Sequence, residues 1–224
     1  MEKIHPLNDP RSLRFKLRKN RSKHIVALVR HIINSENITE LRICDLGGTY
    51  RYWNVFPFDE FPDITFEISL VNIMEKSFKQ EVHFSNVRFV SMIGDGCNME
   101  NTDTDHYHIC HSNSVIEHVG NWKRIKEFVQ ETTRIGKYYY IQTPNYWFPI
   151  EPHYMLPFVH FLPRPIHTSI LRLIKELDFD RATANFDENR MLSRREFKHI
   201  FPNCDHHMEW FILPKSFIAT TKIK

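Results

Sequence analysis

Four polar side chains stand at equivalent places in this sequence, each at the end of a short run of apolar and β-branched residues. They are Asp45, Asn72, Asp95 and Asn113. The carboxyl ends of parallel strands in an open α/β sheet border one crevice, so we expect these side chains to converge there. Two acids and two amides suit a ligand that has a cationic end and several hydroxyl and amine donors. A phosphate-bearing cofactor does not fit that set.

The first of these residues runs directly into a two-glycine turn, Asp45-Leu46-Gly47-Gly48-Thr49. Because glycine has no Cβ, a turn of this kind lets the backbone pass close to a ligand. The spacing fits neither the G-x-G-x-x-G fingerprint of dinucleotide-binding proteins nor the P-loop. The turn therefore indicates a ligand site of another kind.

The elements that would position these residues alternate along the chain. Strand-like runs cover residues 41–45, 64–72, 87–92, 107–111 and 138–143, and helical spacing covers residues 22–35, 122–135, 166–177 and 194–200. Such alternation implies right-handed crossovers and a mostly parallel sheet. Two last runs, 206–213 and 216–223, predict a closing hairpin. We therefore predict a single α/β domain over residues 1–224, with a seven-stranded Rossmann-like sheet, helices on both faces and a C-terminal antiparallel hairpin.

Two further motifs follow the third and fourth predicted strands. The first is Gly94-Asp95-Gly96-Cys97, and the second, residues 112–119, reads SNSVIEHV. With the glycine turn before them, these motifs resemble those of the class I S-adenosylmethionine-dependent methyltransferases, in particular the small-molecule enzymes of the type 11/12 group. The resemblance covers roughly residues 39–224 and implies S-adenosylmethionine as the cofactor.

The resemblance also implies which residues contact that cofactor. Asp45 would lie near the amino-acid end with Gly47, Gly48 and Thr49, Asn72 would meet the ribose, Asp95 would meet adenine beside Gly96 and the Cys97 amide, and Asn113 would line the methionyl part. The family usually has an acid where Asn72 stands. Glu67 is the other candidate for the ribose, but it lies in the first half of its strand, away from the crevice.

Three residues are candidates for the catalytic group. A methyl group on sulfonium is already activated, so the protein has to align a nucleophile and exclude water. An oxygen nucleophile also needs a base, which contributes ~10²–10⁴-fold in rate. His118 and His153 are candidates for that base, with Glu117 as orienting group or second candidate. His118 has an alternative role, which is to support the cofactor loop.

Residues 144–165 are rich in proline and aromatic residues and follow the fifth predicted strand. They form either the wall of a substrate pocket or a hydrophobic cap over the sheet. We favour the pocket wall, and a small molecule as acceptor, with O-methylation of a sugar or another hydroxylated compound. A quinone or aromatic acceptor is the alternative. SNSV replaces the N/D-P-P-Y/F motif of DNA methylases, which counts against a nucleic-acid substrate.

Two other functions stay open at this point. The missing ribose acid, and His108 where the family usually has aspartate, are compatible with a catalytically silent protein that keeps the cofactor pocket. A nicotinamide dehydrogenase is the third possibility. Tighter binding of NAD than of S-adenosylhomocysteine would support it.

Charge and the lengths of the apolar runs limit which partners and locations we expect for this protein. The chain has 30 basic and 27 acidic residues and a net charge of +3, which does not indicate a nucleic-acid partner. The basic residues gather within an N-terminal arm, residues 1–21, and just beyond it. That run is either a solvated face or a lid that attracts an anionic substrate. Its first residues lack the apolar core of a signal peptide, and no apolar run approaches the ~18 residues of a membrane span.

Cysteine and histidine usage leads to two further expectations. The four cysteines form no C-x-x-C pair, which favours free thiols in a reducing, cytoplasmic setting. His106, His108 and His111 invite a metal interpretation, but a strand places the first two on one face and the third on the other. No matched ligand set is evident, so we expect no metal site.

Overall fold

A seven-stranded sheet organises the computed structural model, which describes residues 11–74 and 84–223. Its strands are β1 (Glu40–Leu46), β2 (Thr65–Asn72), β3 (Val87–Ile93), β4 (Tyr107–Asn113), β5 (Gly136–Pro144), β8 (Asp205–Phe211) and β9 (Leu213–Thr220). They lie in the order β3-β2-β1-β4-β5-β9-β8. The first five are parallel, and β9 pairs antiparallel with β5 and β8. The predicted fold class is confirmed.

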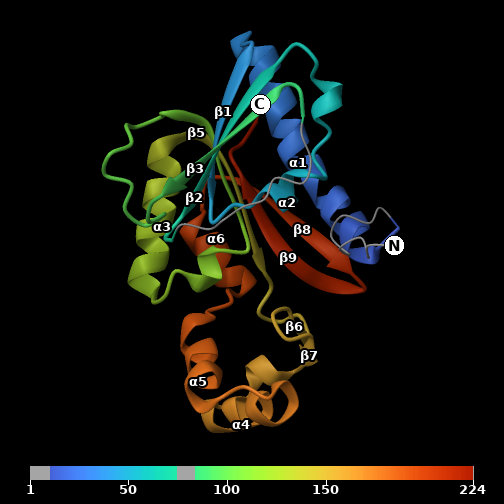
Figure 1. The fold of residues 1–224 in the computed structure, drawn as a ribbon, viewed down its shortest axis with the longest axis vertical. Helices are drawn as coiled ribbons and strands as arrows, with labels where there is room; N and C mark the ends of the chain where they lie inside the picture. The colour runs from blue at the N-terminus through green and yellow to red at the C-terminus, as the bar shows by residue number, and fades with distance from the viewer. Residues whose placement is uncertain (1–10, 75–83, 224) are drawn as a thin grey trace.

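Helices cover both faces of this sheet (Figure 1). One face carries α1 (Leu13–Glu36) and α2 (Tyr50–Trp53), and the other carries α3 (Trp122–Ile135) and α6 (Arg194–Ile200). Side chains alternate along β1, so Ile43 joins the core that contains Ile25, whereas Cys44 joins the core that contains Phe128. The two cores hold the carboxyl ends of the strands at one edge.

Helix α1 begins earlier than the sequence indicated. Helical spacing predicted a start near residue 22, but the helix begins at Leu13, and the Ser12 hydroxyl accepts a hydrogen bond from Phe15 N at 3.1 Å. Ser22 lies inside the helix and donates to the Lys19 carbonyl at 2.8 Å. Apolar periodicity starts only at Ile25, although the basic residues before it are good helix formers. Much of the predicted arm is therefore helix, and its first ten residues lie outside the described residues.

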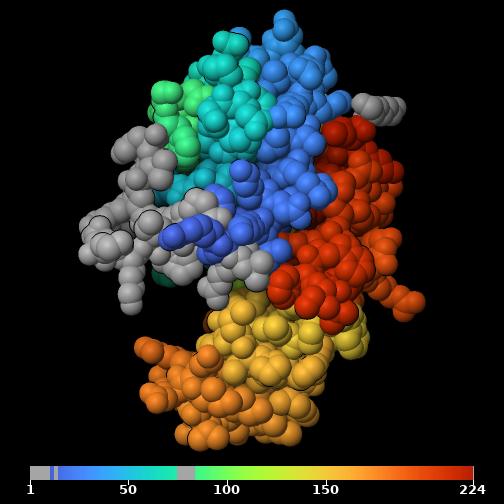
Figure 2. All heavy atoms as spheres, turned by 90° about the vertical axis from the view of Figure 1, so that its right-hand side faces the viewer, coloured from blue at the N-terminus to red at the C-terminus, as the bar shows by residue number. Residues whose placement is uncertain are grey.

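The chain between β5 and α6 forms a lobe that projects from the sheet (Figures 1 and 2). It contains β6 (Ile150–Glu151), β7 (Leu156–Pro157), α4 (Arg164–Lys175), α5 (Phe179–Glu188) and a 3-10 turn, η3 (Val159–Phe161). Helix α4 was predicted two residues later, and α5 was not predicted. The insertion expected over residues 144–165 is thus the first part of a larger lobe. Two other 3-10 turns are η1 (Phe58–Glu60) and η2 (Ile116–His118).

Two further observations concern the cysteines and the apolarity of the helices. All four cysteines are free and buried. Within residues 11–74 and 84–223, no helix combines the length and the apolarity that crossing a bilayer requires.

The contact between α1 and β8 brings two histidine rings together. The His24 and His207 rings stack with centroids 4.0 Å apart. Burial, followed by the charges of His207 and Lys23, lowers the pKa of His24 from 6.5 to about 4. Burial also lowers the pKa of His207, with His206 and Lys23 acting in the same direction and Asp205 opposing them.

Stability should therefore fall as the pH drops below 6.5 towards 4, because the unfolded chain then binds a proton that the folded His24 refuses. We expect His24→Phe to lose less unfolding free energy than the wild type between pH 7.5 and pH 5. Urea unfolding at the two pH values measures the difference. His106→Ala, at an exposed position, is the control. Equal losses in all three proteins would show that the stacked pair is not responsible.

Candidate active site

Asp45 lies at the end of β1 with its carboxylate directed into the protein. The residue is 1% exposed. Its Oδ2 accepts a hydrogen bond from Trp53 Nε1 at 2.9 Å, and its Oδ1 lies 2.6 Å from His111 Nδ1 on β4. Both oxygens thus have protein partners beneath the turn. The structure gives Asp45 a role in holding β1, α2 and β4 together, and its proposed role at the cofactor remains a prediction.

The turn after Asp45 requires glycine at both positions. Gly47 has a φ of +71°, and a Cβ there would lie 2.4 Å from a methyl group of Val115. A Cβ at Gly48 would lie 2.1 Å from Asp45 Oδ2. Thr49 follows at the N-cap position of α2. The turn is therefore packed on its inner side by Asp45 and by the segment that follows β4.

The two candidates for the ribose contact differ in their surroundings. Asn72, at the end of β2, is buried, and its Nδ2 donates to the Gly48 carbonyl at 3.1 Å. It therefore braces the glycine turn from the neighbouring strand. Glu67 lies opposite Arg88 in the β2–β3 register and pairs with it at 3.3 Å. Glu67 thus lies far from the strand end. The ribose contact of Asn72 stays a prediction.

Asp95 is a charged group in the turn after β3. Its Oδ1 accepts from the Cys97 amide at 2.9 Å, and its Oδ2 lies 2.5 Å from Arg124 Nη2. Desolvation raises the pKa of Asp95, but the Cys97 amide and Arg124 outweigh it and hold the pKa below its usual value. A Cβ on Gly96 would lie 3.0 Å from the Phe128 ring, so this turn packs closely against α3.

Hydrogen bonds tie the neighbouring strand ends together. Gly47 N donates to the Val71 carbonyl at 2.7 Å, and Gly94 N donates to the Asn72 carbonyl at 2.9 Å. On the other side of β1, Ser112 Oγ donates to the Leu46 carbonyl at 3.1 Å. Asn113 follows, and its buried Oδ1 has no hydrogen-bond partner among the described residues. The structure thus brings the ends of β1 to β4 to one edge, although the Asp45 carboxylate turns away from it.

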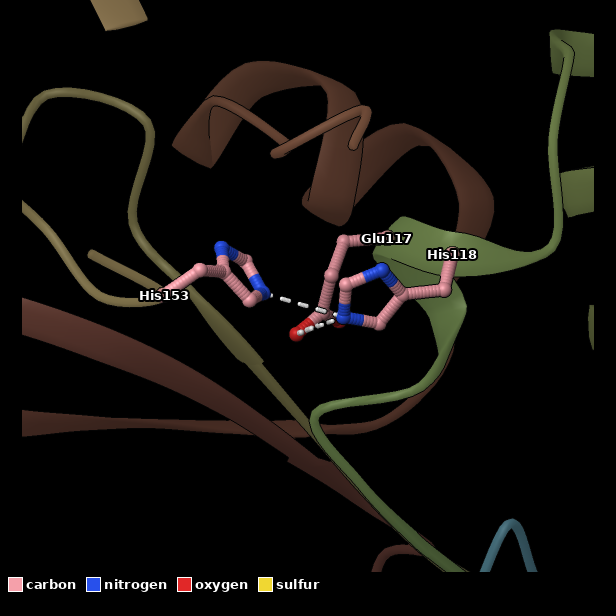
Figure 3. A group of neighbouring side chains, drawn as sticks. All are labelled: Glu117, His118 and His153. Atoms are coloured by element: carbon pink, nitrogen blue, oxygen red, sulfur yellow. Dashed lines mark hydrogen bonds and ion pairs between the residues drawn. The ribbon is translucent and has the colours of Figure 1, made fainter. Parts of the chain in front are cut away.

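The three catalytic candidates do lie together (Figure 3). Glu117 and His118 belong to η2, and His153 comes from the lobe. His118 Nε2 lies 3.0 Å from His153 Nε2 and 4.0 Å from Glu117 Oε1. Desolvation raises the pKa of the fully buried Glu117 to about 7. Burial, and then the charge of His153, lowers the pKa of His118 to about 4.

A cavity of about 460 Å³ lies beside this group of residues. None of the three lines it, but Glu151, which contacts His153, does. Its lining includes Asn121, Tyr146, Glu151, His160, Asn185 and Arg190. The lobe supplies most of these, and the Arg190 amide donates to the Glu117 carbonyl at 2.7 Å, which joins the cavity wall to η2. None of the residues predicted to contact the cofactor lines this cavity.

The sequence did not predict the part of the cavity wall that α5 and the residues after it form. A signal was present, since the Asp178 side chain caps α5 by accepting from Arg181 N at 2.7 Å. Helix α5 is a short, mostly polar helix that buries a single residue, Ala182, so few apolar residues mark it in the sequence. The cap alone does not predict a helix.

Comparisons with known proteins agree on the architecture. No family model and no curated protein matches the sequence. Among solved structures, the PH0226 protein from Pyrococcus horikoshii OT3 matches with a TM-score of 0.53 and 12% identity, over 99% of this chain and 97% of that one. Magnesium protoporphyrin IX methyltransferase from Synechocystis PCC 6803, with bound SAH, matches with a TM-score of 0.50 and 12% identity, over 93% and 85%.

A third match is LepI, in complex with SAM, with a TM-score of 0.52 and 7% identity, over 87% of this chain and 46% of that one. Identities this low establish the fold and nothing finer. The chain has the class I methyltransferase fold. On that fold, the glycine turn and the ends of β2, β3 and β4 stand together at one edge of the sheet, where the sequence had predicted a ligand crevice.

Proposed function

We propose that this protein is an S-adenosylmethionine-dependent methyltransferase that O-methylates a small hydroxylated molecule. The observation that carries the proposal is the set of polar groups and glycine turns in register at the carboxyl edge of a class I methyltransferase fold. We expect it to act in the cytoplasm.

The residues at this edge fit the proposed cofactor chemically. Asp95 is charged and its side chain is 40% exposed, so it has capacity to accept from the adenine amine. The orphaned Asn113 Oδ1 suits a cationic donor at the methionyl end. Gly47, Gly48 and Thr49 would lie against the cofactor, and the Asn72 amide oxygen would accept from a ribose hydroxyl. When bound, the cofactor supplies an activated methyl group.

The chain's own part in the reaction is to orient the acceptor and take its proton. His153 Nδ1 contacts the Glu151 carboxylate, which fixes the imidazole and directs Nε2 towards His118. An acceptor hydroxyl in the adjoining cavity would pass its proton to this pair of imidazoles. Glu117, anchored by the Thr143 hydroxyl at 3.0 Å, supports η2 from beneath.

The cavity lining favours a hydroxylated acceptor over a quinone. Tyr146 offers an aromatic face for a ring, while Asn121, Asn185 and Arg190 offer hydrogen-bonding groups around it. A quinone has no hydroxyl donor, so it would use fewer of these polar groups than a sugar does. These hydrogen-bonding groups therefore support a sugar or a similar compound.

Asp95→Ala should weaken the binding of S-adenosylhomocysteine about 10–100-fold, because the variant loses a charged hydrogen-bond acceptor. Isothermal titration calorimetry measures the effect. Arg124→Gln removes the ion pair with Asp95 but keeps the carboxylate, and Asp63→Ala removes an exposed acid elsewhere. Both should bind nearly as well as the wild type. If Arg124→Gln loses as much affinity as Asp95→Ala, the loop conformation and not the carboxylate is responsible. Failure of the wild type to bind would reject the proposal.

A catalytically silent cofactor-binding protein is the second candidate. It is favoured by Asn72, which stands where the family has an acid and uses its amide to brace Gly48. Binding of S-adenosylhomocysteine without methyl transfer to any of a broad panel of sugars, phenols and quinols would support it. Transfer to a single class of acceptor would reject it.

A further inference from the structure

Three potential metal ligands converge between η2 and the lobe (Figure 3). One ligand atom each from Glu117, His118 and His153 lies within 4.8 Å of the other two. With metal–ligand bonds of about 2.0–2.1 Å, two adjacent ligand atoms of one ion lie about 2.8–3.4 Å apart, from octahedral to tetrahedral geometry. The 3.0 Å between the two imidazole Nε2 atoms meets this spacing, and the 4.0 Å from His118 Nε2 to Glu117 Oε1 exceeds it, so one of these two side chains would move to bind the ion.

The Glu117 carboxylate has one oxygen without a partner. The side chain is fully buried, and Thr143 Oγ1 donates only to Oε2. Glu117 Oε1 has no hydrogen-bond partner among the described residues, and it is the oxygen that faces His118 Nε2. A buried carboxylate oxygen left unpaired is costly. A cation between Glu117 and the two imidazoles would satisfy it.

The second contact of His153 has the arrangement that metal-binding histidines commonly show. Its Nδ1 contacts Glu151, whose carboxylate is nearly fully buried and also accepts from the Tyr154 amide at 2.6 Å. A carboxylate on Nδ1 fixes the tautomer and leaves the Nε2 lone pair for a metal. Glu151 thus orients His153 towards His118 and Glu117.

We propose that Glu117, His118 and His153 bind one divalent transition-metal ion, with Glu151 as the group that orients His153. Two imidazoles and one carboxylate suit Zn²⁺, Co²⁺ or Mn²⁺ better than a purely oxygen-seeking ion such as Ca²⁺. The His118 and His153 side chains are 37% and 26% exposed, so an ion there keeps coordination positions open on the side away from Glu117.

The site goes beyond the proposed transfer reaction, and its existence does not depend on it. Glu151 also lines the 460 Å³ cavity, so the open side of the ion would adjoin the proposed acceptor site. With an ion in place, both Nε2 atoms coordinate it and cannot take the acceptor proton. The ion would instead lower the pKa of a hydroxyl group bound to it. The sequence had given no metal site because His118 and His153 are 35 residues apart and meet only through the fold of the lobe.

Metal binding can be measured on the whole chain without cofactor or acceptor. The chain is first freed of metal with a chelator, and Co²⁺ is then added while its visible absorption is recorded. Calorimetry with Zn²⁺ gives the stoichiometry. We expect one ion per chain in the wild type. His118→Ala and His153→Ala should weaken binding at least 10-fold, and Glu151→Gln should weaken it about 10–100-fold.

His106→Ala is the matched control, because His106 is an exposed histidine outside this group. It should bind like the wild type. Circular dichroism identifies any variant that fails to fold. Glu117 is fully buried, so Glu117→Gln is the variant most at risk. His118 and His153 are partly exposed, so their variants decide the test even if Glu117→Gln is unfolded. The proposal is overturned if the wild type binds no stoichiometric ion, or if His118→Ala and His153→Ala bind as tightly as His106→Ala.

Discussion

Asp45→Ala is expected to lower the free energy of unfolding by about 3–5 kcal/mol, measured by urea titration without any ligand. The carboxylate has both oxygens on buried partners, Trp53 Nε1 at 2.9 Å and His111 Nδ1 at 2.6 Å. Its removal leaves the indole N–H and the imidazole without an acceptor, in a site that water does not reach. His111 is fully buried and its Nε2 already lacks a hydrogen-bond partner among the described residues, so no second hydrogen bond of the ring compensates for the loss.

Glu67→Ala is the matched control for this result. Glu67 is an acid on the neighbouring strand β2, but its partner Arg88 is 73% exposed. Surface pairs of this kind contribute about 0–1 kcal/mol. A loss for Asp45→Ala no larger than that of Glu67→Ala would contradict the structural role. Titration of S-adenosylhomocysteine into the folded Asp45→Ala protein then tests whether Asp45 also contacts the cofactor, in addition to its structural role.

The sheet was predictable from local pattern. Runs such as 64–72 and 138–143 are short and β-branched or aromatic, and each ends within two residues of an observed strand end. The cap at Ser193 was equally local, and its capping box with Glu196 gives the predicted helix over Arg194–Ile200. These elements depend on neighbours a few residues apart, which a single sequence shows.

The site depends on partners that the sequence does not show. The strand pattern correctly predicted that Asp45 lies near the end of β1. It could not show that the carboxylate would point inward, towards Trp53 in a helix of four residues. His153 was predicted from its place in a proline-rich wall, yet its contact with His118 depends on the path of the whole lobe. Long-range polar pairs are fixed by tertiary structure, so they were the part that the sequence could not supply.

Gly48→Ala is expected to cost at least about 3 kcal/mol of unfolding free energy and to weaken S-adenosylhomocysteine binding in the same variant. The new Cβ would lie 2.1 Å from Asp45 Oδ2 and 2.2 Å from its Cγ. Asp45 cannot withdraw without breaking its contacts with Trp53 and His111. If the turn moves instead, the Asn72 amide loses the Gly48 carbonyl. Urea unfolding and calorimetry measure the two effects.

A double-mutant cycle identifies the cause of this cost. Asp45→Ala removes the two nearest atoms but keeps its own Cβ at 2.7 Å, so the steric cost of Gly48→Ala should be partly relieved in that background. The double variant should therefore be more stable than the sum of the two single losses predicts. Gly48 is not among the glycines with a positive φ, so left-handed backbone strain does not contribute to the cost. Additivity to within about 0.5 kcal/mol would show that Asp45 does not explain the need for glycine at position 48.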